Sequence, residues 1–160
     1  MTSYQGGVAA ESLVASLLSQ SGYDVLVQYG ANQPGYDLVA IKPGRALQVS
    51  VKGSQDGGWV LTAGRKSGRT YHEAADGWLE KHGVNLVFVF VQFKSVKAGE
   101  MPRIYLARAS EVAEHLKSKK GGTGDTRFSE FQVWKSGMAK GITDKIPDEW
   151  KFSQRRIDSL

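Results

Sequence analysis

Hydrophobic residues recur at helical spacing near the start of the chain and in extended runs after it. Apolar side chains at helical spacing over residues 8–20, followed by Gly22, predict an amphipathic helix. Residues 23–29 predict a strand, and the loop 30–35 leads into a second strand that begins at Asp37. Pro43 and Gly44 predict a tight reversal into a third strand, 47–53. These strands predict an antiparallel meander, above all for the pair joined at this reversal.

The pattern then changes to a helix followed by a buried strand. Thr70 and Glu73 have the spacing of a capping box and predict a second helix, which ends at Gly83. Residues 84–93 are almost all apolar and predict a strand buried on both faces and reached by a helical crossover. Residues 103–107 predict another strand, and Ser110 predicts the cap of a short helix through residue 116. The predicted order is α-β-β-β-α-β-β-α.

Two segments are less regular. Residues 59–63 fit an extension of the sheet and a loop equally well. Residues 121–160 contain too many large apolar residues for a disordered tail, so we expect them to pack on the domain as short strands and loops.

The second and third strands place polar groups where chemistry is feasible. Leu47, Val49 and Val51 point to one face of the third strand, so Gln48, Ser50 and Lys52 point to the other. This alternation fits a half-solvated edge strand as well as a site. Residues 38–41 are apolar without alternation, which predicts burial on both faces and a partner, cation or water-filled cleft for Asp37. An aspartate and a lysine on adjacent strands favour a metal-dependent nuclease, because they can hold a divalent cation against a phosphate.

Composition limits the remaining choices. The chain has 160 residues, of which 41% are hydrophobic, and this predicts one domain. The absence of cysteine excludes disulfides and thiolate metal sites, so oxygen or histidine nitrogen must hold any cation. The sequence begins without a basic and apolar leader and contains no run long enough to cross a bilayer, so we expect a cytoplasmic protein with no membrane partner.

Basic charge is concentrated beside the suspected site. The formal net charge is +5, and residues 42–70 contain six basic residues and one acidic residue. This concentration favours a polyanionic partner such as DNA, although a solvated basic loop has the same pattern. Glu11 lies at the margin of the apolar stripe of the first helix, where it either leans into a cleft or is an exposed residue favourable to the helix dipole.

With these residues in place, the chain resembles the PD-(D/E)XK nuclease superfamily, which has the restriction-endonuclease-like fold, and is similar to archaeal Holliday-junction resolvases and related small endonucleases. The resemblance spans residues 7–93 and extends more loosely to 116. It rests on Gly7 and Glu11 in a Gly-x-x-x-Glu start, on Asp37 before an apolar strand, and on Lys52 in Val-Lys-Gly. It implies an α/β fold with an αβββαβ core and a mixed central sheet flanked by helices. The domain would span 1–160, with a core of about 7–118 and an extension, 121–160, packed on it.

The resemblance also implies a mechanism and exposes one departure. Mg²⁺ or Mn²⁺ would be held by Asp37, Glu11 and the carbonyl of Val49 or Ser50, and Lys52 would orient the attacking water. Ser50 stands where the family usually has an acidic residue, and water or the carbonyl of Gln48 would fill that place. A serine hydroxyl is a neutral, weak ligand, so cation affinity should be lower than for a carboxylate pair.

The implied partner is duplex or branched DNA, and symmetric cuts by a fold with one site would require a homodimer, although the sequence leaves the oligomeric state open. Backbone phosphates would be held by Arg65, Lys66, Arg69 and His72, and Ser54 and Gln55 would lie near the mouth of the site. His72 also fits a plain position on the helix surface. Two further functions stay open: a catalytically weakened or inactive DNA-binding or regulatory module of the same fold, and a protein-binding domain of the immunity type.

Overall fold

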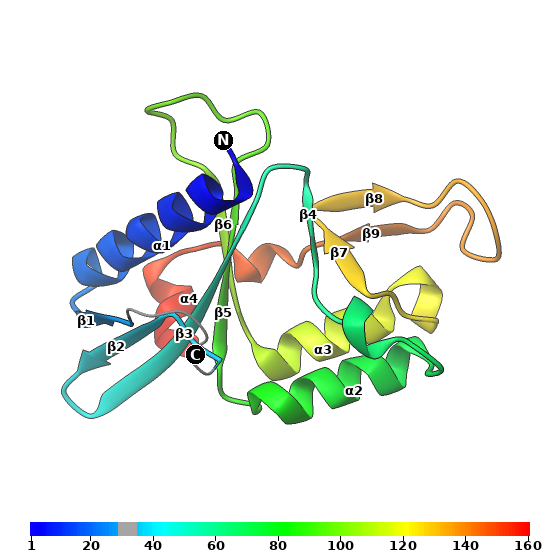
Figure 1. Cartoon of the computed structure of the whole chain (residues 1–160), viewed down its shortest axis with the longest axis horizontal. Coiled ribbons are helices and arrows are strands. Elements are labelled where there is room, and N and C mark those ends of the chain that lie inside the picture. The colour runs from blue at the N-terminus through cyan, green and yellow to red at the C-terminus, as the bar shows by residue number, and fades with distance from the viewer. Residues whose placement is uncertain (29–34) are drawn as a thin grey trace.

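A computed structural model describes residues 1–28 and 35–160, and its elements follow the predicted order with β4 and three 3₁₀ turns added (Figure 1). The elements of the first two thirds are α1 (Ser3–Gln20), β1 (Asp24–Val27), β2 (Leu38–Lys42), β3 (Arg45–Ser54), β4 (Gly58–Val60), η1 (Ala63–Arg65), α2 (Tyr71–His82), β5 (Val87–Gln92), β6 (Arg103–Arg108) and α3 (Ala109–Ser118). Those of the last third are η2 (Lys120–Gly122), β7 (Arg127–Ser129), β8 (Phe131–Val133), β9 (Thr143–Lys145), η3 (Asp148–Trp150) and α4 (Gln154–Ser159). The last third contains short strands, as predicted, and also the helix α4, which was not predicted. The predicted end of the first strand at Tyr29 and most of the loop 30–35 lie outside the described residues.

The main sheet is mixed and contains the strands that the hydrophobic pattern predicts. Its order is β1-β2-β3-β5-β6, with β1, β2 and β3 antiparallel in sequence. Strand β5 runs parallel to β3, β6 runs antiparallel to β5, and all residues of β5 are buried. The α/β fold class with a mixed central sheet flanked by helices is therefore confirmed, as is the helical crossover into a buried strand.

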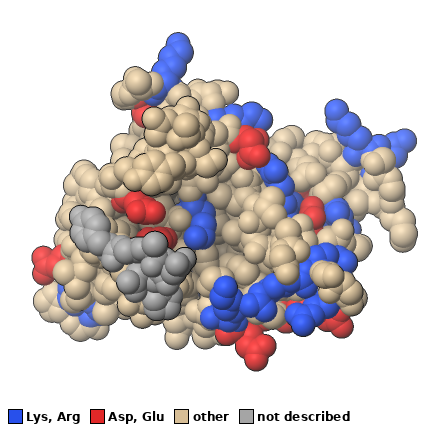
Figure 2. Space-filling model, viewed as in Figure 1, with Lys and Arg blue, Asp and Glu red and all other residues tan. Residues whose placement is uncertain are grey.

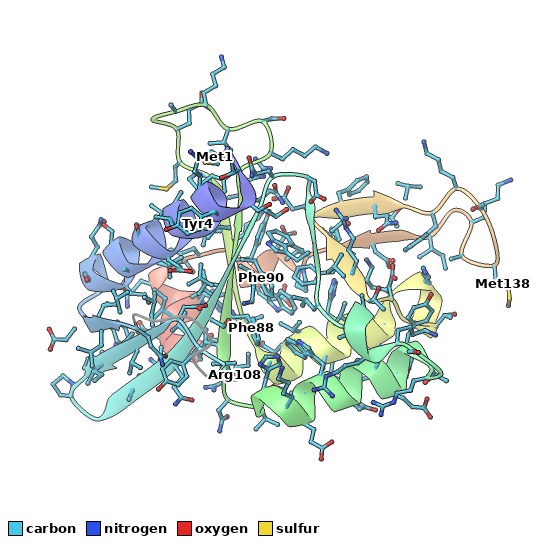
Figure 3. All side chains as sticks on the ribbon, viewed as in Figure 1. Met1, Tyr4, Phe88, Phe90, Arg108 and Met138 are labelled. Atoms are coloured by element: carbon cyan, nitrogen blue, oxygen red, sulfur yellow. The ribbon has the colours of Figure 1, made fainter. Side chains whose placement is uncertain are left out.

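Helices cover both faces of this sheet and enclose two cores (Figure 1). On one face, Ala10 and Val14 of α1 and Ile157 of α4 pack against the inward residues of β3, including Val49. On the other face, α2 and α3 pack on β5 and β6. Phe88 of β5, labelled in Figure 3, contacts the Trp78 ring of α2 at a centroid distance of 4.9 Å. Strand β3 therefore turns one set of side chains to the first core and leaves the alternate set for the other face.

The helix boundaries show where local signals were sufficient. Thr70 and Glu73 form the predicted capping box, and Gly83 follows α2 with φ of 77°. Helix α1 begins at Ser3, five residues before the prediction, because Thr2 and Gln5 form a capping box of their own. The predicted cap at Ser110 is wrong: α3 begins at Ala109, and Glu111 accepts the Arg108 backbone N–H at 2.7 Å. Among the described helices, none has the length and apolar character needed to cross a bilayer.

The prediction that residues 38–41 are buried on both faces is wrong. Leu38 and Ala40 are buried, whereas Val39 is half-buried and Ile41 is 38% exposed. Strand β2 lies one place from the edge of the sheet, and the second core draws its strand residues from β4 to β7 and none from β2. Strand β2 is therefore covered on one face only.

The segment after β3 forms neither of the two predicted structures. Strand β4 pairs with β7 in a separate two-stranded sheet, in which Trp59 lies opposite Phe128. Trp59 packs on Phe90 and Phe128 at centroid distances of 5.3 and 5.2 Å, so this aromatic residue belongs to the second core. The last third of the chain contacts that core through Phe128, Ile146 and Trp150 and also forms the β8–β9 hairpin.

Candidate active site

The candidate site begins where strand β3 outlasts its pairing with β2. The β2–β3 ladder stops at Leu38 opposite Val49, whereas β3 continues to Ser54 beside β5. Within residues 1–28 and 35–160, no strand pairs with this last part of β3 on its β2 side. We call this open edge, residues 50–54, the notch. Its backbone groups require partners other than a neighbouring strand.

Asp37 closes the inner end of the notch. Its backbone N–H donates to the Val49 carbonyl at 2.8 Å. Its carboxylate oxygen Oδ2 accepts the Val51 backbone N–H at 2.6 Å and the Ser50 hydroxyl at 3.2 Å. The other oxygen, Oδ1, makes no hydrogen bond within the described part of the chain. The carboxylate is thus anchored through one oxygen, which leaves the other as an acceptor.

Glu11 approaches the same place from α1. Burial raises the pKa of this half-buried carboxyl, the charge of Asp37 raises it further, and the charge of Lys52 lowers it. Charge interactions across a protein surface are screened over about 10 Å. The charges of Asp37 and Lys52 that act on Glu11 therefore lie near it. Figure 2 shows acidic and basic atoms side by side next to α1 on this face. A raised carboxyl pKa beside a second carboxylate is typical of functional sites and indicates unfavourable like charge.

Lys52 supplies the positive charge of the notch. It lies opposite Phe90 in the parallel β3–β5 ladder, and its side chain is half-buried. Its main-chain carbonyl accepts the Trp59 indole N–H at 2.9 Å, which attaches β4 to this point of β3. Among the described residues its ammonium makes no ion pair within 4 Å, so it is available to an incoming anion.

The remaining predicted ligands are placed differently from one another. Ser50 is 2% exposed and uses its hydroxyl to hold Asp37. Gln48 is exposed and lies opposite Val39 inside the ladder, and within the described structure the hydrogen bonds to the Asp37 carboxylate come from Ser50 and Val51 and not from Gln48. The structure therefore brings Ser50 to the acidic residue and leaves Gln48 aside.

The predicted carbonyl ligand requires a correction. The Val49 carbonyl accepts the Asp37 N–H, and the main-chain groups of Ser50 point to the other side of the strand, toward β5. The N–H of Val51 points to Asp37, and the carbonyl of one strand residue points to the same side as its N–H. The carbonyls that face the notch are therefore those of Gly53 and Val51, and the one nearer to Asp37 belongs to Val51. Its apolar side chain hid this from sequence reasoning, because the signal lies in the ladder register.

A close backbone approach fixes α1 against the notch. A Cβ atom on Gly53 would lie 2.9 Å from the Gly6 carbonyl oxygen and 3.3 Å from the Ala10 Cβ. Only glycine permits this contact, which places the turn of α1 that carries Glu11 beside β3. Gly6 and Gly53 thus have a positioning role.

Ser54 and Gln55 line a cleft of about 500 Å³ beside α1 and β4, together with Lys52. The Ser54 hydroxyl lies 2.7 Å from the Gly58 carbonyl and 2.9 Å from the Asp56 carboxylate, so it stabilises the turn into β4. The Gln55 side chain is exposed and lies near Gly6. Both residues line this cleft with Lys52, and of the two Gln55 is the more accessible.

The predicted phosphate contacts divide into free and engaged side chains. Arg65 and Arg69 make no ion pair with a carboxylate among the described residues. Lys66 donates to the Arg69 carbonyl at 2.6 Å and lies 4.7 Å from the centre of the Tyr71 ring. His72 Nε2 lies 2.7 Å from the Gly122 carbonyl, so that nitrogen is already hydrogen-bonded. The two arginines are the available cations of this set.

The donor set fits a weakly held divalent cation. Two carboxylates and one main-chain carbonyl are oxygen donors that Mg²⁺ accepts. The described residues contain no group of three or more histidine or acidic side chains able to hold a metal. The like charge of Asp37 that raises the pKa of Glu11 is what a bound cation would relieve.

The fold and this geometry define a mixed α/β protein with an acid, acid and amine cluster beside basic side chains. Comparison of the sequence with protein families and with curated proteins gives no match. Among solved structures, the chain is similar to the 1.6 Å structure of Hjc, a Holliday junction resolvase from Archaeoglobus fulgidus. The TM-score is 0.44 at 15% sequence identity, over 78% of this chain and 84% of that chain. At these values the likeness does not extend to activity, and the proposals below rest on the residues of this chain.

Proposed function

We propose that this protein is a divalent-metal-dependent DNA endonuclease that hydrolyses phosphodiester bonds, with Glu11, Asp37 and Lys52 at its active site. The observation that carries the proposal is the convergence of three charged groups: Asp37 is hydrogen-bonded to β3 one residue before Lys52, and α1, which carries Glu11, packs against Gly53. Burial raises the pKa of Glu11, the charge of Asp37 raises it further, and the charge of Lys52 lowers it. Two carboxylates and an amine in one neighbourhood suit a cation and a phosphate better than they suit a stable fold alone.

Each residue of the site has a separate role. Oδ1 of Asp37, the carboxylate of Glu11 and the carbonyl of Val51 would hold Mg²⁺ or Mn²⁺. A bound divalent cation supplies charge neutralisation at the scissile phosphate and lowers the pKa of a nearby water. Lys52 donates to a phosphate oxygen and stabilises the negative charge that develops there. Ser50 keeps Asp37 in position through its hydroxyl.

The DNA would lie across the notch and the basic residues that follow it in sequence. Arg65 and Arg69 bind backbone phosphates, and Gln55 contacts the strand near Lys52. Lys66 and His72 contribute less, because both are already hydrogen-bonded. Branched DNA with two symmetric strands would require a homodimer for paired cuts.

The direct test is cleavage by the full chain of duplex, branched and single-stranded DNA in Mg²⁺ or Mn²⁺. We expect Asp37→Asn and Lys52→Met to lower the cleavage rate by at least about 100-fold, as loss of charge stabilisation does in other active sites. Lys97→Met is the matched control, because Lys97 is exposed in the loop between β5 and β6. Undiminished cleavage by both site variants would reject the site.

A second candidate is a DNA-binding module of the same fold with little or no catalysis. One observation favours it: the Asp37 carboxylate is engaged by Ser50 and Val51, which is a structural role for an acid at the end of a ladder. Salt-sensitive DNA binding by the wild type, without cutting in either metal, would select this candidate.

A further inference from the structure

A second basic region lies between η1 and α2. It is a pocket of about 560 Å³, called the η1–α2 pocket below, with no acidic residue in its lining. The lining residues that carry its chemistry are Arg65, Ser67, Arg69, Lys81 and His82. Lys81 and His82 belong to the last turn of α2, so these groups come from two separate elements.

Two guanidinium groups converge over Gly77, in the middle of α2. A Cβ atom on Gly77 would lie 3.5 Å from Nη1 of Arg65 and 3.5 Å from Nη1 of Arg69. The two nitrogens are therefore at most twice that distance apart. A phosphate whose oxygens accept N–H bonds of about 2.8 Å can be held between two guanidinium groups at such a separation. Like charges brought this close favour an anion between them.

Nearby carboxylates do not neutralise this pair. Glu73, Asp76 and Glu80 line an adjacent groove with Arg69 and Gly77. Glu73 accepts the Thr70 backbone N–H at 2.8 Å, and Asp76 pairs with Lys117 at 2.9 Å. The backbone N–H leaves the charge of Glu73 in place, so Glu73 and Glu80 stand against the three cationic side chains of the pocket. The local charge is therefore positive, and no ion pair of the described residues uses Arg65, Arg69 or Lys81.

The pocket is connected to the notch in two ways. The charges of Lys81, Lys52 and Arg65 act on His82, whose pKa is lowered first by burial and then by these cations. Lys52 is thus shared, since its charge also reaches Glu11. In addition, Leu61 lines both the cleft beside Lys52 and the η1–α2 pocket, so the two hollows adjoin just after β4. Figure 2 shows basic atoms gathered over the region of η1 and α2 on the face of the notch.

We propose that Arg65, Arg69 and Lys81 form a phosphate-binding subsite around Gly77 for a nucleic-acid strand, next to the phosphate held at Lys52. The identity of the ligand as nucleic acid rests on the proposed function, whereas the subsite itself needs no cation. Ser67 and neutral His82 add hydrogen-bond donors at its walls. The nucleic-acid strand passes Leu61 between the phosphate at Lys52 and the phosphate at the subsite. These two contacts set the direction of the strand across the protein.

The first test measures duplex binding by the full chain in EDTA at a series of salt concentrations. Each lost phosphate contact lowers the slope of log K against log salt by about 0.9, so Arg65→Gln with Arg69→Gln should lower it by about 2 and weaken binding at least about tenfold. Lys97→Gln with Lys145→Gln is the matched control, since it removes the same charge from exposed lysines elsewhere. An unchanged slope in the arginine variant would overturn the subsite.

The second test uses shape instead of charge. Gly77→Ala should raise Tm, because alanine favours a helix interior and the added Cβ meets only ordinary contacts. It should also weaken DNA binding about threefold or more, because the methyl group narrows the space between the guanidiniums. Gly7→Ala in α1, where a Cβ meets nothing within 4 Å, should raise Tm without changing affinity. Equal affinity for Gly77→Ala and the wild type would contradict the subsite.

Inorganic phosphate distinguishes a strand from a free ligand. If the pocket binds a free phosphate compound, inorganic phosphate will raise the Tm of the wild type but not that of the double arginine variant, and both proteins will bind DNA equally. This result would overturn the assignment of the pocket to a nucleic-acid strand. The endonuclease proposal fails separately. If the double arginine variant shows the expected change of salt slope but the wild type does not cleave DNA, the endonuclease proposal is rejected and the subsite is retained. If the wild type cleaves DNA but the salt slope of the variant is unchanged, the subsite is rejected and the endonuclease proposal is retained.

Discussion

The notch and the η1–α2 pocket arrange charge in opposite ways. In the notch, Asp37 is held by hydrogen bonds from Ser50 and Val51, so the ladder register determines where the carboxylate lies. Beside the pocket, Arg65 and Arg69 converge over Gly77, and within the described part of the chain neither forms an ion pair with a carboxylate. The comparison indicates separate roles: the notch, with its hydrogen-bonded carboxylate, suits catalysis, and the η1–α2 pocket, with its excess of positive charge, suits DNA affinity. Mutations should separate these properties.

The largest effect on the notch should come from Gly53→Ala. The new Cβ would lie 2.9 Å from the Gly6 carbonyl, so α1 must move away from β3. We expect a loss of about 1–3 kcal/mol in the free energy of unfolding, as for other overpacked sites, measured by urea denaturation. Cleavage should fall as well, because Glu11 moves with α1. Gly7→Ala is the control on the same helix, and equal stability of the two variants would show that the close approach is unimportant.

Removal of the Asp37 carboxylate should separate its structural role from its chemical one. Asp37→Ala leaves the Val51 N–H and the Ser50 hydroxyl without their acceptor, which costs about 1–2 kcal/mol of unfolding free energy. Asp37→Asn retains an oxygen acceptor and should lose less stability, although both variants lose cleavage. Chemical denaturation measures the unfolding free energy of both variants. Asp24→Ala is the control, because Asp24 is an exposed acidic residue at the start of β1. Equal stability of the Ala and Asn variants would argue against the anchoring hydrogen bonds.

In the basic region, Lys66→Gln should have a smaller effect than loss of either arginine. Lys66 already donates to the Arg69 carbonyl and lies over the Tyr71 ring, so it has less to offer a phosphate. We expect less than about a threefold loss of DNA affinity at low salt, compared with about threefold or more for Arg65→Gln alone. Fluorescence anisotropy with a labelled duplex measures both. A larger loss for Lys66→Gln would reverse the assignment of free and engaged cations.

The smallest effect should be the pH dependence caused by Glu11. The pKa of this carboxyl is raised in the folded protein by burial and by Asp37, so its ionisation destabilises the fold. Glu11→Gln should therefore raise Tm by about 1–2 °C at neutral pH, an amount limited by partial exposure. The difference should be absent below the ordinary carboxyl pKa and should grow as pH rises through the raised value. A difference that is constant with pH would exclude this electrostatic origin.

Local signals predicted those parts of the fold that depend on near neighbours in sequence. The Thr70 and Glu73 capping box, the reversal at Pro43 and Gly44, and the uninterrupted apolar run of β5 were sufficient for their elements. The early start of α1 was missed because its first turns are poor in apolar residues and Gly6 packs on a distant strand. Pairing of β4 with β7 was missed because it joins segments nearly seventy positions apart.

The candidate site was predictable by residue type and not by contact. Asp37, Lys52 and Glu11 were named from their places in the pattern and from the family resemblance. The sequence does not specify the register of β2 on β3. This register determines that the Ser50 hydroxyl donates to Asp37 and that the Val51 carbonyl faces the notch. The convergence of Arg65 and Arg69 over Gly77 requires two separate elements to be placed together.

The central claim is that Asp37 and Glu11 hold a divalent cation. Its most direct test is to measure Mn²⁺ binding to the full chain without DNA by isothermal titration calorimetry. The account predicts one weak site in the wild type, a loss of affinity of at least about tenfold in Asp37→Asn and in Glu11→Gln, and no change in Arg65→Gln with Arg69→Gln. Equal Mn²⁺ binding by the wild type and the two carboxylate variants would contradict it.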